Sequence, residues 1–161
     1  MLRSLKFLII VPLILGATCA REHKNDKINW VDFNTGFKQA QAEGKIAVID
    51  CYTEWCGWCK VMDKKTFGND TIIQRINEKY IAIKFNPELP FKYDIGLADS
   101  VTGKQLLMAL SNNSPSGYPT FFFFVPQNKK MFQVPGYHDV SAFNTRLDEL
   151  EQYQKSVVKT P

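Results

Sequence analysis

A short apolar run followed closely by two cysteines constrains the fold of this chain more than any other feature. Residues 46–49 are Ile-Ala-Val-Ile, a continuous apolar segment with the length of a strand buried on both faces. Residues 54–60 follow and read Glu-Trp-Cys-Gly-Trp-Cys-Lys, and residues 59–66 are expected to be helical. A buried strand that leads through a short loop into a helix is typical of a sheet covered by helices, so we expect an α/β fold.

The rest of the periodicity predicts a mixed sheet flanked by helices. Further helices are expected at residues 34–42, 71–79, 104–110 and 141–154, and further strands at residues 80–85, 119–125 and 130–134. Gly44 would close the first of these helices, and Asn69 or Asp70 would cap the second. Residues 86–116 form a connection longer than the ~10–12 residues that a strand–helix–strand link needs, so we expect an extended crossover.

The Cys-x-x-Cys motif is compatible with either a metal site or a redox site, and the rest of the sequence gives little support for a metal. A structural zinc needs four ligands, and the chain has one such motif and no paired histidines. Cys51, Cys56 and Cys59 have the C-x4-C-x2-C spacing of a [2Fe–2S] site, but Cys51 continues the apolar strand and the fourth ligand could only be Cys19. We expect no metal and no cofactor, with the iron–sulfur cluster kept as an alternative.

A redox role follows from the place of the motif at the start of a helix. Cys56 would lie at the helix N-terminus, where free N–H groups and the helix dipole favour an anion and lower the pKa of a thiol. Cys59 would lie one turn further on the same face, within reach to form a disulfide, and Lys60 adds a positive charge. This arrangement predicts a reactive thiolate at Cys56.

Three separate segments resemble one known family. Residues 48–60, Val-Ile-Asp-Cys-Tyr-Thr-Glu-Trp-Cys-Gly-Trp-Cys-Lys, resemble the active-site segment of the thioredoxin-fold thiol–disulfide oxidoreductases. Residues 62–67, Met-Asp-Lys-Lys-Thr-Phe, are similar to its exported branch, including the C-terminal domain of the interchange protein DsbD. Residues 117–120, Gly-Tyr-Pro-Thr, match the family's cis-proline loop. The resemblance covers residues 30–151 and implies a thioredoxin fold.

The resemblance also implies roles for single residues. Cys56 aligns with the attacking cysteine and Cys59 with the resolving one. Asp50 aligns with a buried carboxylate behind the resolving cysteine and Lys84 with the lysine beside it, so Asp50 would take the proton of Cys59, unless the two form a plain buried ion pair. The residues expected to bind substrate are Trp55, Gly57, Trp58, Tyr118, Pro119 and Gly136.

One departure from the family concerns the direction of electron flow. Trp58 stands where thioredoxins have proline and the disulfide oxidants have histidine. This position tunes the reduction potential, and potentials on this scaffold span about 150 mV. The motif therefore predicts the chemistry and leaves its direction open.

The N-terminus has the pattern of an export signal. Arg3 and Lys6 precede an apolar stretch, residues 7–18, that is shorter than the ~20 residues needed to span a bilayer. Residues 16–20, Gly-Ala-Thr-Cys-Ala, allow either lipidation of Cys19 or ordinary cleavage near residue 20, and a retained N-terminal anchor is a further alternative. We expect a signal at residues 1–20, a polar tether at residues 21–29, a thioredoxin-like domain at residues 30–155 and a tail at residues 156–161.

These features lead to one functional interpretation. The formal charge of +4 includes two residues of the signal and gives no electrostatic footprint for nucleic acid. We expect a monomeric periplasmic enzyme, attached to a membrane only through a lipid on Cys19, that reduces or exchanges disulfides in exported proteins and draws electrons from a membrane donor. The alternatives are a disulfide isomerase and a thioredoxin-fold binding module without turnover.

Overall fold

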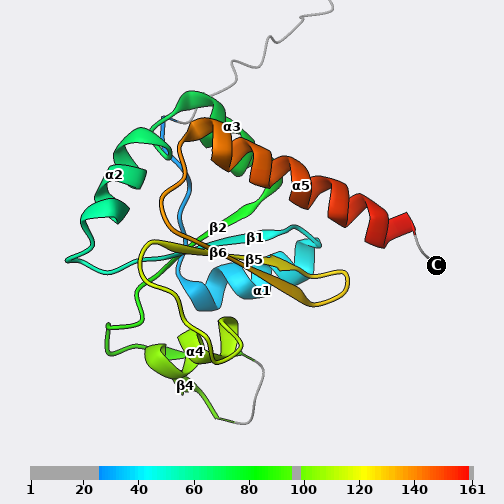
Figure 1. Cartoon of the computed structure of the whole chain (residues 1–161). Helices are drawn as coiled ribbons and strands as arrows, with labels where there is room; N and C mark the ends of the chain where they lie inside the picture. The colour runs from blue at the N-terminus through cyan, green and yellow to red at the C-terminus, as the bar shows by residue number, and fades with distance from the viewer. Residues whose placement is uncertain (1–25, 96–98, 160–161) are drawn as a thin grey trace, which may run out of the picture.

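The computed structural model describes residues 26–95 and 99–159, and these fold around one main sheet (Figure 1). The helices are α1 (Phe33–Glu43), α2 (Gly57–Lys65), α3 (Asp70–Lys79), α4 (Gly103–Leu110) and α5 (Val140–Lys159). The strands are β1 (Ala47–Cys51), β2 (Ile81–Phe85), β3 (Lys92–Tyr93), β4 (Val101–Thr102), β5 (Thr120–Val125) and β6 (Lys130–Pro135). Every helix and strand that the sequence predicted is present, with its ends shifted by a few residues.

The main sheet is mixed, as predicted. Its strand order is β2-β1-β5-β6, with β1 parallel to β2 and antiparallel to β5, and β5 antiparallel to β6. β1 therefore lies in the interior of the sheet. The register pairs Asp50 with Lys84 and Cys51 with Thr120, so the residues that follow β1 lie beside those that precede β5.

Helices cover both faces of the sheet and enclose two apolar cores (Figure 1). The first core lies between the sheet and α2, α3 and α5, and it includes Phe121 and Phe123. The second lies between the sheet and α1 and α4, and it includes Phe122 and Phe124. Because neighbouring residues of a strand point to opposite faces, Asp50 of β1 lies on the α2 side while its neighbour Cys51 lies in the second core.

Local sequence signals set the ends of the helices. Asp32 caps α1 by accepting a hydrogen bond from the Thr35 N–H, and Gly44 ends it in the left-handed region at φ 65°. Asn69, and not Asp70, caps α3, because its Oδ1 accepts from the backbone N–H of Thr71. These residues define where the helices that precede β1 and β2, α1 and α3, begin and where α1 ends.

The extended crossover contains more regular structure than the sequence predicted. Besides α4 it holds an antiparallel pair, β3 with β4, whose two-residue strands are too short to show an alternating pattern. A capping box between Thr102 and Gln105 starts α4. A Cβ atom on Gly103 would lie 2.4 Å from the carbonyl oxygen of Pro87, so only glycine fits where the start of α4 meets the start of the crossover.

Packed residues precede the predicted domain at its N-terminal limit, and helix continues beyond its C-terminal limit. Ile28 is buried, and the side chain of Asn77 hydrogen-bonds the carbonyl of Lys27 and the N–H of Asn29, so the tether ends earlier than expected. At the other end α5 continues to Lys159. The signal at residues 1–20 and Cys19 lie outside the described residues. Within the described ranges, no helix is both long enough and apolar enough to cross a membrane.

Candidate active site

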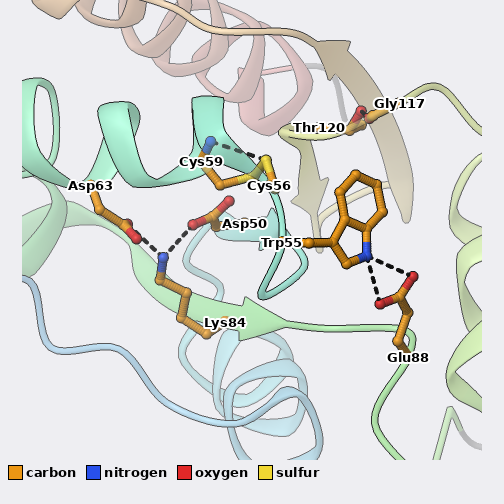
Figure 2. The surroundings of a disulfide bond; sticks show 9 residues. All are labelled: Asp50, Trp55, Cys56, Cys59, Asp63, Lys84, Glu88, Gly117 and Thr120. Atoms are coloured by element: carbon orange, nitrogen blue, oxygen red, sulfur yellow. Dashed lines mark hydrogen bonds and ion pairs between the residues drawn. A yellow bond between two sulfur atoms is a disulfide. The ribbon is translucent and has the colours of Figure 1, made fainter.

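Cys56 and Cys59 form a disulfide at the N-terminus of α2 (Figure 2). Cys56 is the N-cap residue of this helix, and its Sγ accepts a hydrogen bond from the Cys59 N–H at 3.0 Å. Both residues are buried, so exposure does not separate their roles. Their positions in the helix separate the roles. The sulfur of Cys56 at the cap faces free N–H groups and the positive end of the helix dipole, which stabilise a thiolate at Cys56 once the bond is reduced.

An ionic network lies behind the disulfide. The Lys84 amine donates to the carboxylate of Asp50 at 2.6 Å and to the carboxylate of Asp63 at 2.6 Å. Figure 2 shows the Asp50 carboxyl between the cysteine pair and Lys84. Asp50 is buried, while the Asp63 side chain is 48% exposed, so Lys84 links an interior acid to a carboxylate at the surface.

The surroundings shift the proton equilibria of this network. Burial raises the pKa of Asp50 to about 6, and the nearby charge of Asp63 adds to this rise, whereas Lys84 opposes it. Burial favours the neutral amine at Lys84, but the two carboxylates raise its pKa above the ordinary value. Lys84 therefore stays charged while Asp50 changes its protonation near neutral pH. A carboxyl with such a pKa can accept and release a proton under ordinary conditions.

Two exposed tryptophans flank the disulfide. Trp55 is 67% exposed and Trp58 is 61% exposed. The Trp55 ring packs edge-on against Tyr118, and its Nε1 donates to both carboxylate oxygens of Glu88 at 3.0 and 3.3 Å (Figure 2). Trp58 packs against Tyr137. Exposed aromatic residues that are held by neighbours form a surface suited to contact with another molecule.

The proline loop and Gly136 meet beside the start of β5. The Tyr118–Pro119 peptide bond is cis. The Gly136 N–H donates to the Pro119 carbonyl at 2.8 Å, and Gly136 adopts a φ of 89°, which favours glycine. Thr120 follows Pro119 and pairs with Cys51 at the end of β1. Residues 118, 119 and 136, which lie far from the cysteines in the sequence, are thus gathered near them, and Gly57 is the exposed first residue of α2.

Cys51 is not part of this arrangement. It is a buried free thiol in the core on the opposite face of the sheet, and burial raises its pKa. In residues 26–95 and 99–159, no group of three or more histidine, cysteine or acidic side chains could hold a metal ion. The C-x4-C-x2-C spacing therefore does not translate into three cysteines around one point.

Two residues of the site were missed by the sequence analysis. Asp63 lies four residues after Cys59, which is one helical turn, and this spacing could have placed it near the pair. Glu88 contacts Trp55 across 33 residues of sequence, and no local pattern signals such a contact.

Comparison with known proteins agrees with this geometry. Residues 17–158 match the family model Thioredox_DsbH, described as a protein of unknown function, DUF255. The "Thiol:disulfide interchange protein DsbD" of Salmonella paratyphi A is 28% identical over 112 residues, which cover 68% of this chain and 18% of the relative. The chain thus spans less than a fifth of the length of this curated relative.

Solved structures share the fold. A thioredoxin from Thermus thermophilus superposes with a TM-score of 0.59 at 18% identity, covering 77% of this chain and 87% of that one. The oxidised DsbD C-terminal domain of Neisseria meningitidis gives 0.50 at 17% identity, covering 74% and 97%. The thioredoxin fold predicted from the sequence is therefore confirmed, with the redox-type disulfide in place. Because the family model spans most of its length, the chain belongs to the Thioredox_DsbH family, DUF255.

Proposed function

We propose that this protein is an exported thiol–disulfide oxidoreductase that reduces or exchanges disulfides in other proteins through Cys56 and Cys59. The observation that carries the proposal is the Cys56–Cys59 disulfide at a helix N-terminus with the Asp50–Lys84 pair behind it. The helix stabilises the attacking thiolate, and the buried carboxyl can take a proton from the second thiol.

The first chemical step is attack by the reduced enzyme. The Cys56 thiolate attacks one sulfur of the substrate disulfide, a bond forms between Cys56 and that sulfur, and the other substrate sulfur leaves as a thiolate. The Cys59 N–H, which donates to the Cys56 sulfur in the disulfide, supports negative charge on that sulfur before attack. The product of this step is a mixed disulfide.

The second step releases the substrate. Cys59 gives its proton to the Asp50 carboxylate and attacks the Cys56 sulfur, and the remaining substrate sulfur leaves as a thiolate. Two electrons have then passed from the enzyme to the substrate, and the Cys56–Cys59 disulfide has formed. Asp50 releases its proton through the Lys84–Asp63 side of the network, which reaches the surface. A dithiol donor must reduce the enzyme again.

The location and the partners of the enzyme belong to the same proposal. The signal pattern of residues 1–20 favours export to the periplasm, where protein disulfides persist, with Cys19 either lipidated or removed. The substrates are exported proteins with disulfides, and the electron donor is a membrane dithiol protein. The name of the DsbD relatives, thiol:disulfide interchange protein, supports thiol–disulfide exchange as the reaction.

Reduction of insulin tests the activity. With dithiothreitol as the electron source, the protein should accelerate the precipitation of insulin, and Cys56→Ser should return the rate to that of dithiothreitol alone. Cys51→Ala is the matched control, because this cysteine lies in the opposite core and the variant should keep full activity. No acceleration by the wild-type protein would favour a binding module that keeps the fold without turnover.

A further inference from the structure

We propose that a cleft behind the Asp50–Lys84 pair binds a small, flat, uncharged aromatic molecule that carries a carbonyl group. The cleft lies where the start of α1 and the end of β2 meet the first residues of the crossover, and its volume is about 580 Å³. Small-molecule sites in proteins have volumes of roughly 300–1,000 Å³. We call this site the aromatic cleft; its lining includes Trp30, Tyr52, Lys84, Asn86, Phe91 and Tyr93.

The walls of the aromatic cleft are rings that the fold already holds in place. Tyr93 is buried and packs edge-on against Phe33 at 5.7 Å and Phe85 at 5.3 Å between ring centroids. Phe91, by contrast, is 60% exposed and has solvent where a ligand ring could stack. Because flat apolar walls favour offset or edge-on stacking with another ring, the shape selects an aromatic ligand.

The side-chain amide of Asn86, in the lining of the aromatic cleft, indicates which polar group the ligand carries. Asn86 is only 4% exposed, and its Oδ1 accepts a hydrogen bond from the Glu88 N–H at 3.0 Å, which defines the orientation of the side chain. Its Nδ2 has no hydrogen-bond partner in the part of the chain that the structure describes. This nitrogen is not sealed from solvent, because Thr53 Oγ1 is the only fully buried side-chain nitrogen or oxygen without a partner in the described part of the chain, so a ligand in the aromatic cleft could replace water at it. A carbonyl oxygen on the ligand would satisfy this donor.

The charges around the aromatic cleft favour an uncharged ligand. Lys84 lines it, but its amine already binds the carboxylates of Asp50 and Asp63 and lies within 5.0 Å of the ring centroids of Trp30 and Tyr52. It therefore offers no uncompensated positive charge to an anion. The two other charged residues of the lining, Asp32 and Lys92, are exposed and opposite in sign.

Benzamide is a suitable probe, because it combines one aromatic ring with one carbonyl. In an NMR titration of the purified protein, it should shift the side-chain amide signals of Asn86 and the indole signal of Trp30 in a saturable way. The indole signal of Trp58, on the disulfide side, should stay in place. Acetamide lacks the ring and benzoate carries a charge, so both should bind about tenfold more weakly or worse.

Two variants complete the test. Phe91→Ala removes an exposed ring without touching the core, and it should weaken benzamide binding about tenfold. Met108→Ala, a partly exposed apolar residue of α4 outside the lining, should bind like the wild type. The proposal is overturned if benzamide produces no saturable Asn86 shift, if Phe91→Ala binds it equally well, or if benzoate binds as tightly. None of these outcomes bears on the cysteine pair, so they leave the proposed disulfide exchange untouched.

Discussion

At the scale of single residues, the position of Cys56 at the start of α2 separates two chemically similar thiols. The cap position places its sulfur against the Cys59 N–H and the helix dipole, while Cys59 lies within the helix and Cys51 in the opposite core. Thiolate content controls reactivity, because the thiolate and not the thiol is the nucleophile.

The reduced protein should therefore react with iodoacetamide first at Cys56. A thiol of pKa ~8.5 is only a few per cent ionised at neutral pH and one near ~7 is about half ionised, so alkylation at Cys56 should be about tenfold faster than at Cys59 or Cys51. Peptide mapping by mass spectrometry after short exposures gives the three rates. Faster labelling of Cys59 would reverse the roles assigned here.

The role of Asp50 as a base predicts how the release of the mixed disulfide depends on pH. A base must be ionised to accept the Cys59 proton, so the release rate should rise with pH and reach half its maximum near pH 6, the pKa of Asp50. Asp50→Asn should lack this rise and release substrate about a hundredfold more slowly, with attack by Cys56 unchanged. Stopped-flow measurement on a model mixed disulfide resolves the two steps.

Asp63→Asn is the matched control for this experiment. It keeps the base but removes a nearby negative charge that raises the Asp50 pKa, so the midpoint of the release profile should move below pH 6. If Asp50→Asn shows the wild-type profile, Asp50 and Lys84 are a buried ion pair without a part in proton transfer.

At the scale of elements, the strands and helices that carry the site were predictable, whereas in the crossover only its length and the helix α4 were. The run at residues 46–49 and the cysteine motif locate β1 and α2, because buried strands are continuous apolar runs and the loop between them is short. The family resemblance and the order of elements then place Asp50 beside Lys84, as the observed register does. The β3–β4 pair and the Glu88–Trp55 bond have no local signal, since they depend on contacts between distant segments.

The contact between Gly103 and Pro87 predicts how firmly the crossover is attached. Gly103→Ala puts a methyl group 2.4 Å from a backbone oxygen that cannot rotate away, so it should lower the free energy of unfolding by about 1–3 kcal/mol. Gly117→Ala is the matched control, since no atom outside its two chain neighbours lies within 4 Å of its added methyl group. Urea denaturation of both variants gives the comparison, and equal stabilities would show that the crossover adapts at no cost.

At the scale of the whole molecule, the buried Asp50 makes stability depend on pH. Its pKa is about 6 in the folded protein against an ordinary value of 3.8, so the folded state binds this proton more tightly. The protonated Asp50 stabilises the folded protein at pH values below 3.8, the ordinary pKa. This stability is lost as the pH rises toward 6, the pKa of Asp50 in the folded state. Here the loss falls between about pH 4 and 6 and reaches up to ~3 kcal/mol.

Asp50→Asn should escape this loss. Between pH 4 and pH 7, the oxidised wild type should lose up to ~3 kcal/mol of unfolding free energy relative to the oxidised variant. Lys84 does not contribute in this window, because its pKa is raised above the ordinary lysine value. Denaturant titrations across this pH range measure the difference, and a constant difference would mean that Asp50 has an ordinary pKa in the folded protein.

Trapping the mixed disulfide tests whether the protein exchanges disulfides with other proteins through Cys56. Cys59 normally breaks that bond from within the site at a high effective concentration, so Cys59→Ala should let the adduct accumulate. Adducts from cells that produce Cys59→Ala are separated by non-reducing electrophoresis and identified by mass spectrometry, with Cys56→Ala/Cys59→Ala as the control. Exported, cysteine-containing proteins should be bound to the single variant alone. Equal patterns for the two variants would contradict this expectation, because they would show that Cys56 forms no bond with protein substrates.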